Sequence, residues 1–437
     1  MRVAEPAARA DSGAAGDTAP AAGRFPLGLA LMLGAALMIN YVDRGTISTA
    51  APLIKREFGL DALQMGLLLS AFFTTYVLSQ PFMGILVDRL GAARVLAAGF
   101  TVWSVGTFLT GLSSGIASLV ALRLVMGAGE SVCYPSGFAL ISRRVQHQHR
   151  ARATALMQLG SVVGPALGTF IGGWVMIRYG WRSMFMALGL ASLLWLIPWS
   201  GQLRARAPVA AAAARAAGPR WIDIVRQRAL WGTVLGNFCS NYAFYFVFTS
   251  VPLYLVEERG LSLGAMTNVQ SLIFVMDSGS ILATGWLIDW WIRRGATPSL
   301  AYKTALSLSA AGVGVCLLSL SGAGALAGAA LLLALGLADG LNSPSVGALT
   351  QRFAGPLATG RWMGTQNAIS NTAGFLAPSV TGYLVKHNGG HYTVALWITG
   401  GVALLGLVAW FFAVPPVEPV DWSRPRATRI AARAPGP

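Results

Sequence analysis

The sequence predicts an all-α membrane protein whose twelve transmembrane helices form two pseudo-symmetric bundles of six. Three observations lead to this fold class. Of the 437 residues, 55% are hydrophobic and only 11% are charged, whereas a soluble globular protein carries roughly 25% charged residues. Apolar runs near the roughly 20 residues that cross a bilayer as a helix recur along the chain. An internal repeat divides these runs into two sets.

Turn residues and charge clusters separate the apolar runs into individual spans. The predicted spans are residues 26–51, 63–87, 93–112, 115–141, 153–176, 183–201, 229–256, 264–288, 301–320, 323–350, 363–385 and 393–413. If both termini are cytoplasmic, 24 of the 32 Lys and Arg residues fall in the tails and inner loops. Six fall outside, namely Lys55, Arg56, Arg178, Arg182, Arg259 and Lys386. This satisfies the positive-inside rule and predicts a multi-pass protein of the cell (cytoplasmic or inner) membrane with both termini cytoplasmic.

Polar segments complete the predicted domain organisation. Residues 1–24 lack the continuous apolar core of a signal peptide and predict a disordered cytoplasmic tail. The Ala/Arg/Pro-rich stretch from Arg204 to Pro219 is the longest polar interruption. We therefore expect a first bundle over 25–201, a cytoplasmic linker over 202–228, a second bundle over 229–413 and a C-terminal cytoplasmic tail over 414–437.

Short matching segments recur in the two predicted bundles in the same order. The matched positions, 201 residues apart in the early spans and 209 apart in the later ones, are Asn40-Tyr41 with Asn241-Tyr242, Gly84 to Asp88 with Gly285 to Asp289, and Glu130-x4-Pro135-Ser136 with Asp339-x4-Pro344-Ser345. Any one match could arise by chance. Co-linear matches through several pairs of spans argue for duplicated six-helix halves.

The composition excludes several functional classes. Cys133, Cys239 and Cys316 lie in apolar runs without a pairing pattern, so neither a disulfide framework nor a metal site is indicated. The basic residues mark topology rather than a nucleic-acid surface. No Gly-x4-Gly-Lys-Ser/Thr loop occurs, and no nucleophile, base or metal-ligand set shares one depth. We expect no enzyme activity and no cofactor, with a proton gradient as the energy source.

The loop after the second span carries a family signature. Gly84-Ile-Leu-Val-Asp88-Arg89-Leu-Gly91-Ala-Ala-Arg94 resembles the signature loop of the major facilitator superfamily, with a degenerate copy from Gly285 that includes Asp289. The resemblance extends from Phe25 to Val414. It implies alternating access, in which Gly84, Asp88, Arg89, Gly91, Arg94 and Asp289 form a conformational latch on the cytoplasmic side of the outward-open state.

Motifs in three spans narrow the resemblance. Asn40-Tyr-Val-Asp-Arg44, Arg123-x6-Glu130-Ser131 and the segment from Tyr245 to Leu255 are similar to the anion:cation symporter family, which includes sugar-acid, hexuronate and vesicular organic-anion carriers. The resemblance implies proton-coupled uptake of a small organic anion, with a sugar acid such as an aldonate, uronate or aldarate as the expected substrate. By the same resemblance, Tyr41, Arg44 and Tyr76 would contact the substrate, and Asp43 and Glu130 would carry or relay the proton.

The charged residues within the spans support this interpretation on physical grounds. A charge in the hydrocarbon costs about 2.5 kcal/mol or more, so an intramembrane ion is expected to face a cavity and to have a function. Arg123 and Glu130 lie two helical turns apart, about 10.5 Å along one face. Arginine keeps its charge and offers planar donors that match a carboxylate, which suits anion binding. A glutamate in a water-free cavity has a raised pKa, which suits it to carry a proton. Alternatively, Arg123 could be a structural partner of Glu130 or Asp43, and Arg44 could pair with an acid elsewhere.

Two further acids depart from the family pattern. Asp339 is the repeat counterpart of Glu130, and Asp277 lies 201 residues after Tyr76, so both are predicted to face the central cavity and to take part in proton coupling. Extra carboxylates could instead favour a cationic or zwitterionic substrate. A structural role near the helix break at Asn342-Ser343-Pro344 is an equal alternative.

Neutral polar residues complete the predicted lining of the site. Those predicted to contact the substrate are Gln158, Asn241, Tyr242, Tyr245 and Asn367, whereas Asn371 is expected mainly to hold helices together.

The glycine-rich fifth span, Gly160-x3-Gly164-Pro165-x2-Gly168, resembles the glycine-proline motif of drug:proton antiporters. A proton-driven exporter of an amphipathic compound is therefore the alternative function. We expect a monomer in the lipid bilayer whose partners are the substrate anion and protons, without nucleic acid.

Overall fold

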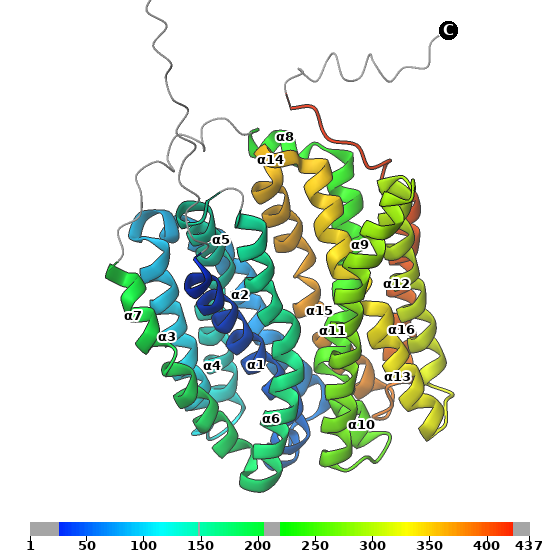
Figure 1. The fold of residues 1–437 in the computed structure, drawn as a ribbon. Coiled ribbons are helices and arrows are strands. Elements are labelled where there is room, and N and C mark those ends of the chain that lie inside the picture. Colours follow the sequence, from blue (N-terminus) through cyan, green and yellow to red (C-terminus); the bar gives the residue numbers. More distant parts are fainter. Residues whose placement is uncertain (1–25, 147–148, 205–218, 423–437) are drawn as a thin grey trace, which may run out of the picture.

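The computed structural model describes residues 26–146, 149–204 and 219–422. The predicted N-terminal tail, most of the predicted linker and residues 423–437 of the predicted C-terminal tail lie outside the described residues. The described segments fold into helices joined by short connections (Figure 1), which confirms the predicted all-α fold class.

The helices follow the order of the predicted spans. Those of the first half are α1 (Leu27–Phe58), α2 (Ala62–Leu90), α3 (Ala92–Thr110), α4 (Ile116–Glu130), α5 (Cys133–Arg144), α6 (Arg150–Leu193) and α7 (Leu196–Arg204). Those of the second half are α8 (Trp221–Val225), α9 (Arg228–Thr249), α10 (Val251–Glu257), α11 (Leu263–Arg293), α12 (Pro298–Leu320), α13 (Ala325–Asp339), α14 (Asn342–Ser370), α15 (Ala373–His387) and α16 (Thr393–Val408), which continues as a π-helical turn over Ala409–Ala413.

Several predicted spans consist of two helices with a short break between them. The fourth span breaks between α4 and α5 just after Glu130, and the tenth breaks between α13 and α14 just after Asp339, the equivalent position in the repeat. The helices α9 and α10 bend by 43° where Pro252 begins α10. Discontinuous helices of this kind expose main-chain groups and are typical of transporter binding sites.

Other predicted spans are joined into one helix. The backbone turns at Gly180 (φ 82°) inside α6 and at Gly355 (φ 62°) inside α14, conformations that glycine adopts with little strain. Nine helices in the described residues are long and apolar enough to cross a membrane, or ten if the bent α9–α10 pair is one span. Arg152–Leu203 counts once in that set although it covers two predicted spans, and the predicted span 363–385, which is divided between α14 and α15, is not in the set. With these two additions the helices agree with a fold of twelve crossings.

The bundle has two ends that differ in how the halves meet. We call the end with the first and last described residues, Pro26 and Trp422, the terminal face, and the opposite end, which includes α10, the distal face (Figure 1). Near the distal face, side chains of both halves, such as Ile54 and Val251, belong to one shared core. Near the terminal face each half has its own core, around Trp199 in the first half and Trp410 in the second. This conformation is therefore closed on the distal side.

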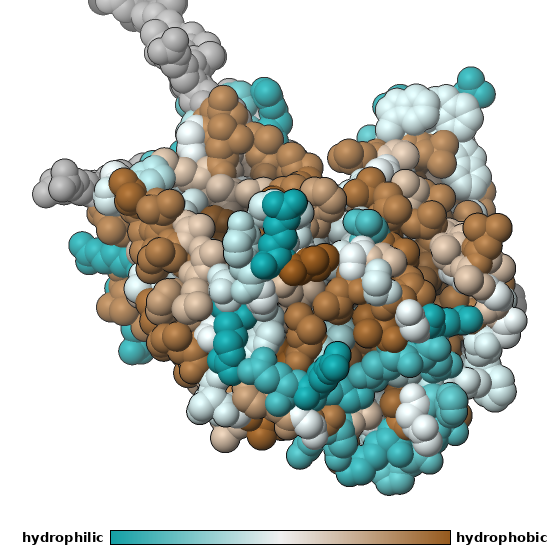
Figure 2. Space-filling view, turned by 90° about the horizontal axis from the view of Figure 1, so that it is seen from below, coloured by the Kyte–Doolittle hydropathy of each residue, from teal (hydrophilic) through white to brown (hydrophobic). Residues whose placement is uncertain are grey.

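Two ion pairs join the halves at the distal face. Lys55 Nζ lies 2.7 Å from a carboxylate oxygen of Glu257, and Lys386 Nζ lies 2.9 Å from Asp61 Oδ2. Hydrophilic side chains gather on this face, as Figure 2 shows. Asp61 also caps α2 through the backbone N–H of Gln64 at 2.8 Å, so one carboxylate both begins a helix and contacts the other half.

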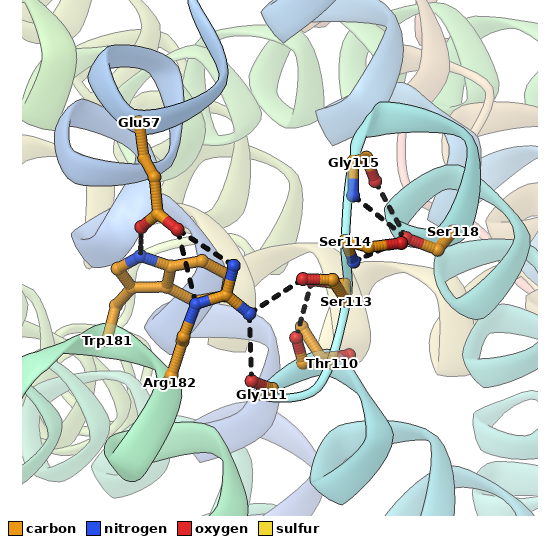
Figure 3. Close-up of polar contacts among 9 residues, drawn as sticks. All are labelled: Glu57, Thr110, Gly111, Ser113, Ser114, Gly115, Ser118, Trp181 and Arg182. Carbon is orange, nitrogen blue, oxygen red and sulfur yellow. Dashed lines mark hydrogen bonds and ion pairs between the residues drawn. The ribbon is translucent and has the colours of Figure 1, made fainter.

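A second polar cluster closes the distal ends of the first-half helices (Figure 3). Glu57 at the end of α1 accepts hydrogen bonds from Trp181 Nε1 at 2.6 Å and from Arg182 Nη2 at 2.8 Å. The same guanidinium donates to the carbonyls of Gly111 (3.1 Å) and Ser113 (2.6 Å), which follow α3. These bonds satisfy carbonyls that the end of a helix leaves without partners.

Candidate substrate site

A buried ion pair between α1 and α4 lies at the centre of the bundle. Arg44 Nε donates to Glu130 Oε2 at 2.7 Å, and the two side chains are 4% and 0% exposed. A buried charge is stable only when it is paired or hydrogen-bonded, so each residue makes the burial of the other possible. Glu130 therefore pairs with a residue 86 positions away rather than with Arg123 on its own helix.

Asp43 lies beside this pair but has its own contact. Thr107 Oγ1 on α3 donates to Asp43 Oδ2 at 3.3 Å, and Asp43 is fully buried. The other carboxylate oxygen, Oδ1, makes no hydrogen bond within the described residues. Asp43 and Arg44, adjacent in the sequence, therefore have separate partners.

Both buried arginines of the site have donors that are unused within the described residues, Nη2 on Arg44 and, on Arg123, Nε and Nη1. The Arg123 side chain is 3% exposed. Its guanidinium carbon lies 4.7 Å from the centre of the Phe72 ring, and that of Arg44 lies 5.0 Å from the same ring. Two guanidinium groups thus flank one aromatic ring, which attracts both through its electron-rich face.

Two tyrosines enclose Arg44 further. The guanidinium carbon lies 4.3 Å from the centre of the Tyr76 ring and 4.9 Å from that of Tyr41. The Tyr41 hydroxyl is 3.3 Å from the hydroxyl of Tyr134 at the start of α5. The structure thus brings the predicted contacts Tyr41, Arg44 and Tyr76 together, and their contact with a substrate stays a prediction.

The second half contributes neutral polar groups to the same centre. The amide oxygen of Asn371 accepts from Tyr245 Oη at 3.0 Å and from Asn241 Nδ2 at 3.3 Å. Tyr245 packs edge-to-face on Phe73 of α2, with ring centres 4.5 Å apart, and Tyr242 belongs to the same buried aromatic cluster. Asn371 holds α9 and α14 together, as expected, and it does so next to the first-half ion pair.

Asp277 and Asp339 lie on neighbouring helices of the second half. Both side chains are half-buried, and their carboxylates are close enough to interact electrostatically. The helices approach closely there, because a Cβ on Gly340 would lie 2.5 Å from the Asp277 carbonyl oxygen. Neither carboxylate has a basic partner within the described residues. A structural ion pair therefore does not account for them.

The remaining predicted residues are more dispersed. Gln158 on α6 is half-buried, and its Oε1 makes no hydrogen bond within the described residues. Asn367 on α14 is exposed, whereas its neighbour Gln366 is buried and accepts from Thr350 Oγ1 at 3.0 Å. Because Gln158 is the more buried of the two side chains, it fits an enclosed site better than Asn367 does.

The predicted latch residues lie toward the terminal face. Gly91 joins α2 to α3 with φ 91°, which explains the need for glycine there. Of the other latch residues, Arg89, Arg94 and Asp289 are exposed and Gly84 is half-buried. The side chain of Asp88 lies outside the described part of the structure. Their latch role in an outward-open state stays a prediction.

Three residues of this centre escaped the sequence analysis: Phe72 and Thr107, which contact charged groups, and Tyr134, which contacts Tyr41. Phe72 precedes Tyr76 by one helical turn, and the two rings stack with centres 5.5 Å apart. That i, i+4 spacing was the available signal. Thr107 and Tyr134 carry no comparable pattern, since each depends on a contact between different spans.

The charges and donors of this centre define its chemistry. The first half places two guanidinium groups beside two carboxylates, and the described residues contain no cluster of three His, Cys, Asp or Glu that could hold a metal ion. Guanidinium groups offer planar donor pairs that match a carboxylate, and a buried carboxyl group can exchange a proton. The arrangement therefore has the donors that suit an anion, beside buried carboxyl groups.

Comparisons with known proteins agree with this arrangement. The family model described as Major Facilitator Superfamily matches residues 33–356 and 301–434. The chain is 27% identical to the hexuronate transporter of Bacillus subtilis, over 89% of this chain and 94% of that protein. It is also 27% identical to the D-galactonate transporter of Escherichia coli, over 89% of this chain and 96% of that protein, and 28% identical to a probable sulfoacetate transporter of Cupriavidus necator, over 88% and 92%.

A solved structure confirms the fold. A bacterial homolog of the human lysosomal transporter Spinster, in an inward-facing and occupied conformation, aligns with a TM-score of 0.74 at 16% identity, over 89% of this chain and 97% of that chain. The match of the family model over most of the sequence decides the family. The chain therefore belongs to the Major Facilitator Superfamily of membrane transporters and is not an enzyme.

Proposed function

We propose that the protein imports a small organic anion together with protons, and that the anion is a sugar acid. The observation that carries the proposal is Arg123, a buried guanidinium with unused donors, next to an Arg44–Glu130 pair. Buried guanidinium donors without hydrogen bonds are costly, and a bound anion would offset that cost. The relatives named as hexuronate and D-galactonate transporters carry substrates of this class.

The coupling follows from competition for Arg44. The substrate carboxylate binds Arg123 and also needs Arg44, whose Nε is bonded to Glu130. Protonation of Glu130 weakens that bond and frees Arg44 for the substrate, so proton and anion occupy the site together. Asp43, which accepts a hydrogen bond from Thr107, is the second candidate for the proton.

The second half suits the hydroxylated part of such a substrate. Asn241, Tyr242, Tyr245 and Gln158 present amides and phenols around the centre. We assign Asp277 and Asp339 to proton coupling as well, since both are half-buried at the repeat positions of Tyr76 and Glu130.

The glycine-rich fifth span, which raised the export alternative, serves helix packing. A Cβ on Gly160 would lie 2.1 Å from the Gly34 carbonyl oxygen of α1, and a Cβ on Gly168 would lie 2.8 Å from the Val42 Cα. Close approach of α1 and α6 accounts for these glycines. No contact in the described residues gives the export alternative a comparable basis.

Orientation completes the proposal. We place the terminal face in the cytoplasm, because Lys55, Arg182, Arg259 and Lys386 are among only six basic residues predicted for the distal side. A monomer in the inner membrane then imports its substrate from the distal side.

The test is uptake by purified protein in proteoliposomes with an imposed pH difference. Aldonates, uronates, aldarates, short dicarboxylates and aromatic acids would be compared, with liposomes lacking protein as the control. Accumulation of a sugar acid that collapses when the pH difference is removed supports the proposal. Uptake of none of these anions, or export of an amphipathic cation driven by the same gradient, would refute it.

A further inference from the structure

The helices α2 and α15 form a tight seam between the halves, which runs inward from the distal face. A Cβ on Gly66 would lie 2.4 Å from the Pro378 carbonyl oxygen, so the two backbones touch. One turn further in, Ser70 Oγ lies 2.7 Å from Ser379 Oγ. This seam must part for the site to open toward the distal side.

Phe73 lies at the inner end of this seam. Its ring is 2% exposed and packs edge-to-face on Tyr245 of the second half, with ring centres 4.5 Å apart. The ring also fits over Gly374, near the start of α15: a Cβ on that glycine would lie 2.5 Å from Phe73 Cδ1 and 2.7 Å from Cγ. A side chain of any size on residue 374 would therefore collide with the ring in this conformation.

The same ring also borders the charged centre. Phe73 contacts Phe72 edge-to-face with ring centres 5.1 Å apart, and Phe72 is the ring between Arg44 and Arg123. Because a helix rises about 1.5 Å per residue, Phe73 lies roughly 10 Å deeper than Gly66. It is thus the last side chain of the seam before the arginines.

We propose that Phe73 is the inner gate on the distal side, and that Gly374 is the notch into which its ring must dock for that side to close. The glycine provides the space, the ring fills it, and Tyr245 covers the ring from the second half. When the halves separate at the distal face, the ring leaves the notch and the path to the arginines opens. The gate depends on the shape of this contact and on no particular substrate.

The experiment measures the opening of the distal face directly, without substrate. Spin labels on cysteines introduced at Ser114 and His387, exposed residues at the distal ends of the two halves, report the distance between the halves by pulsed electron resonance. The three native cysteines are buried, and a sample without introduced cysteines measures any background labelling. Gly374→Ala is compared with wild type, and Gly401→Ala is the matched control, since a Cβ at that helical glycine meets nothing within 4 Å.

Gly374→Ala should raise the ratio of long to short distances by about tenfold, the order expected when a methyl group is forced into a packed contact. Phe73→Ala alone should also open the distal face, because the packing of the ring on Tyr245 is lost. Adding Gly374→Ala to Phe73→Ala should cause no further opening, because the ring with which the new methyl group would collide is absent. Gly401→Ala should match wild type. Phe73→Trp overfills the contact from the other side and should shift the distribution like Gly374→Ala, which keeps the test decisive if Gly374→Ala does not fold.

A wild-type distribution in both Gly374→Ala and Phe73→Trp would overturn the proposal. So would a Phe73→Ala/Gly374→Ala double variant that is more open than Phe73→Ala by the factor that separates Gly374→Ala from wild type, since the collision would then not be with Phe73. Neither result bears on anion transport, so failure of the gate and failure of the proposed function are distinguishable.

Discussion

Replacing Glu130 by glutamine separates substrate binding from proton coupling. The carboxylate holds Arg44 at 2.7 Å and so competes with a substrate anion for it. At an effective dielectric constant of 20, a pair of unit charges about 4 Å apart attract each other by about 4 kcal/mol. The amide keeps the shape and removes this attraction. The formal charge of the Asp43, Arg44, Arg123 and Glu130 group rises from zero to +1.

Substrate affinity of Glu130→Gln should therefore rise by at least about tenfold, which requires about 1.4 kcal/mol, a third of that attraction. Exchange of labelled for unlabelled substrate between two loaded faces should continue. Accumulation driven by a pH difference should be lost, because the residue can no longer release a proton.

The assay compares counterflow with pH-driven uptake in the same proteoliposomes. Glu57→Gln is the matched control, since Glu57 also binds an arginine of the first half but lies at the distal face (Figure 3). It should leave the coupling unchanged. Concentrative uptake at the wild-type level by Glu130→Gln would refute the reasoning and transfer the coupling role to Asp43.

Three further changes test other parts of the molecule. Arg123→Lys should reach the membrane and lose most transport, because an ammonium group cannot reproduce two parallel donors. Uptake would be measured together with the amount of protein in the membrane, and normal uptake would contradict the prediction. Asp277→Asn and Asp339→Asn should each alter the pH dependence or substrate preference of uptake in folded protein, whereas a loss of folding alone, by size-exclusion profile, would indicate a structural role. The pKa of Asp61 is lowered by a hydrogen bond from a backbone N–H of α2 and by Lys386. The carboxylate therefore stabilises the closed distal face above the ordinary pKa of aspartate, and this stabilisation is lost as the pH falls through the lowered pKa. Asp61→Asn should increase the open population at neutral pH and make that population insensitive to acid, as distance measurements across the distal face would report.

Sequence periodicity and the internal repeat were sufficient for the fold. The twelve crossings and their order follow from the apolar runs and the repeat. The break after Glu130 was not predicted, although the sequence indicated a helix break at Asn342-Ser343-Pro344, close to the equivalent position after Asp339. The joining of spans through Gly180 and Gly355 did not follow, because a glycine with positive φ inside a helix looks like any turn glycine in the sequence.

Which charges pair could not be predicted from the sequence. The sequence placed Arg123 and Glu130 on one helical face, and a structural pair between them was an open alternative. The structure instead joins Glu130 to Arg44, a contact that depends on where the tertiary packing places α1 relative to α4. Spacing along one helix restricts which residues share a face. It does not determine which of two arginines on different helices pairs with a given carboxylate.

The position of the charged centre explains how a small electrostatic change could move the whole molecule. The aromatic cluster of Phe72, Phe73, Tyr76, Tyr242 and Tyr245 lies between the shared distal core and the two separate terminal cores. At this depth the halves change from packed together to packed apart, so the cluster is where rocking of the halves displaces side chains least and where either face can be sealed. Arg44 and Arg123 contact Phe72, and Phe73 contacts the second half. In the mechanism we propose, a change in the partners of the arginines is transmitted through the adjacent rings of Phe72 and Phe73 to the gate contact at the distal side.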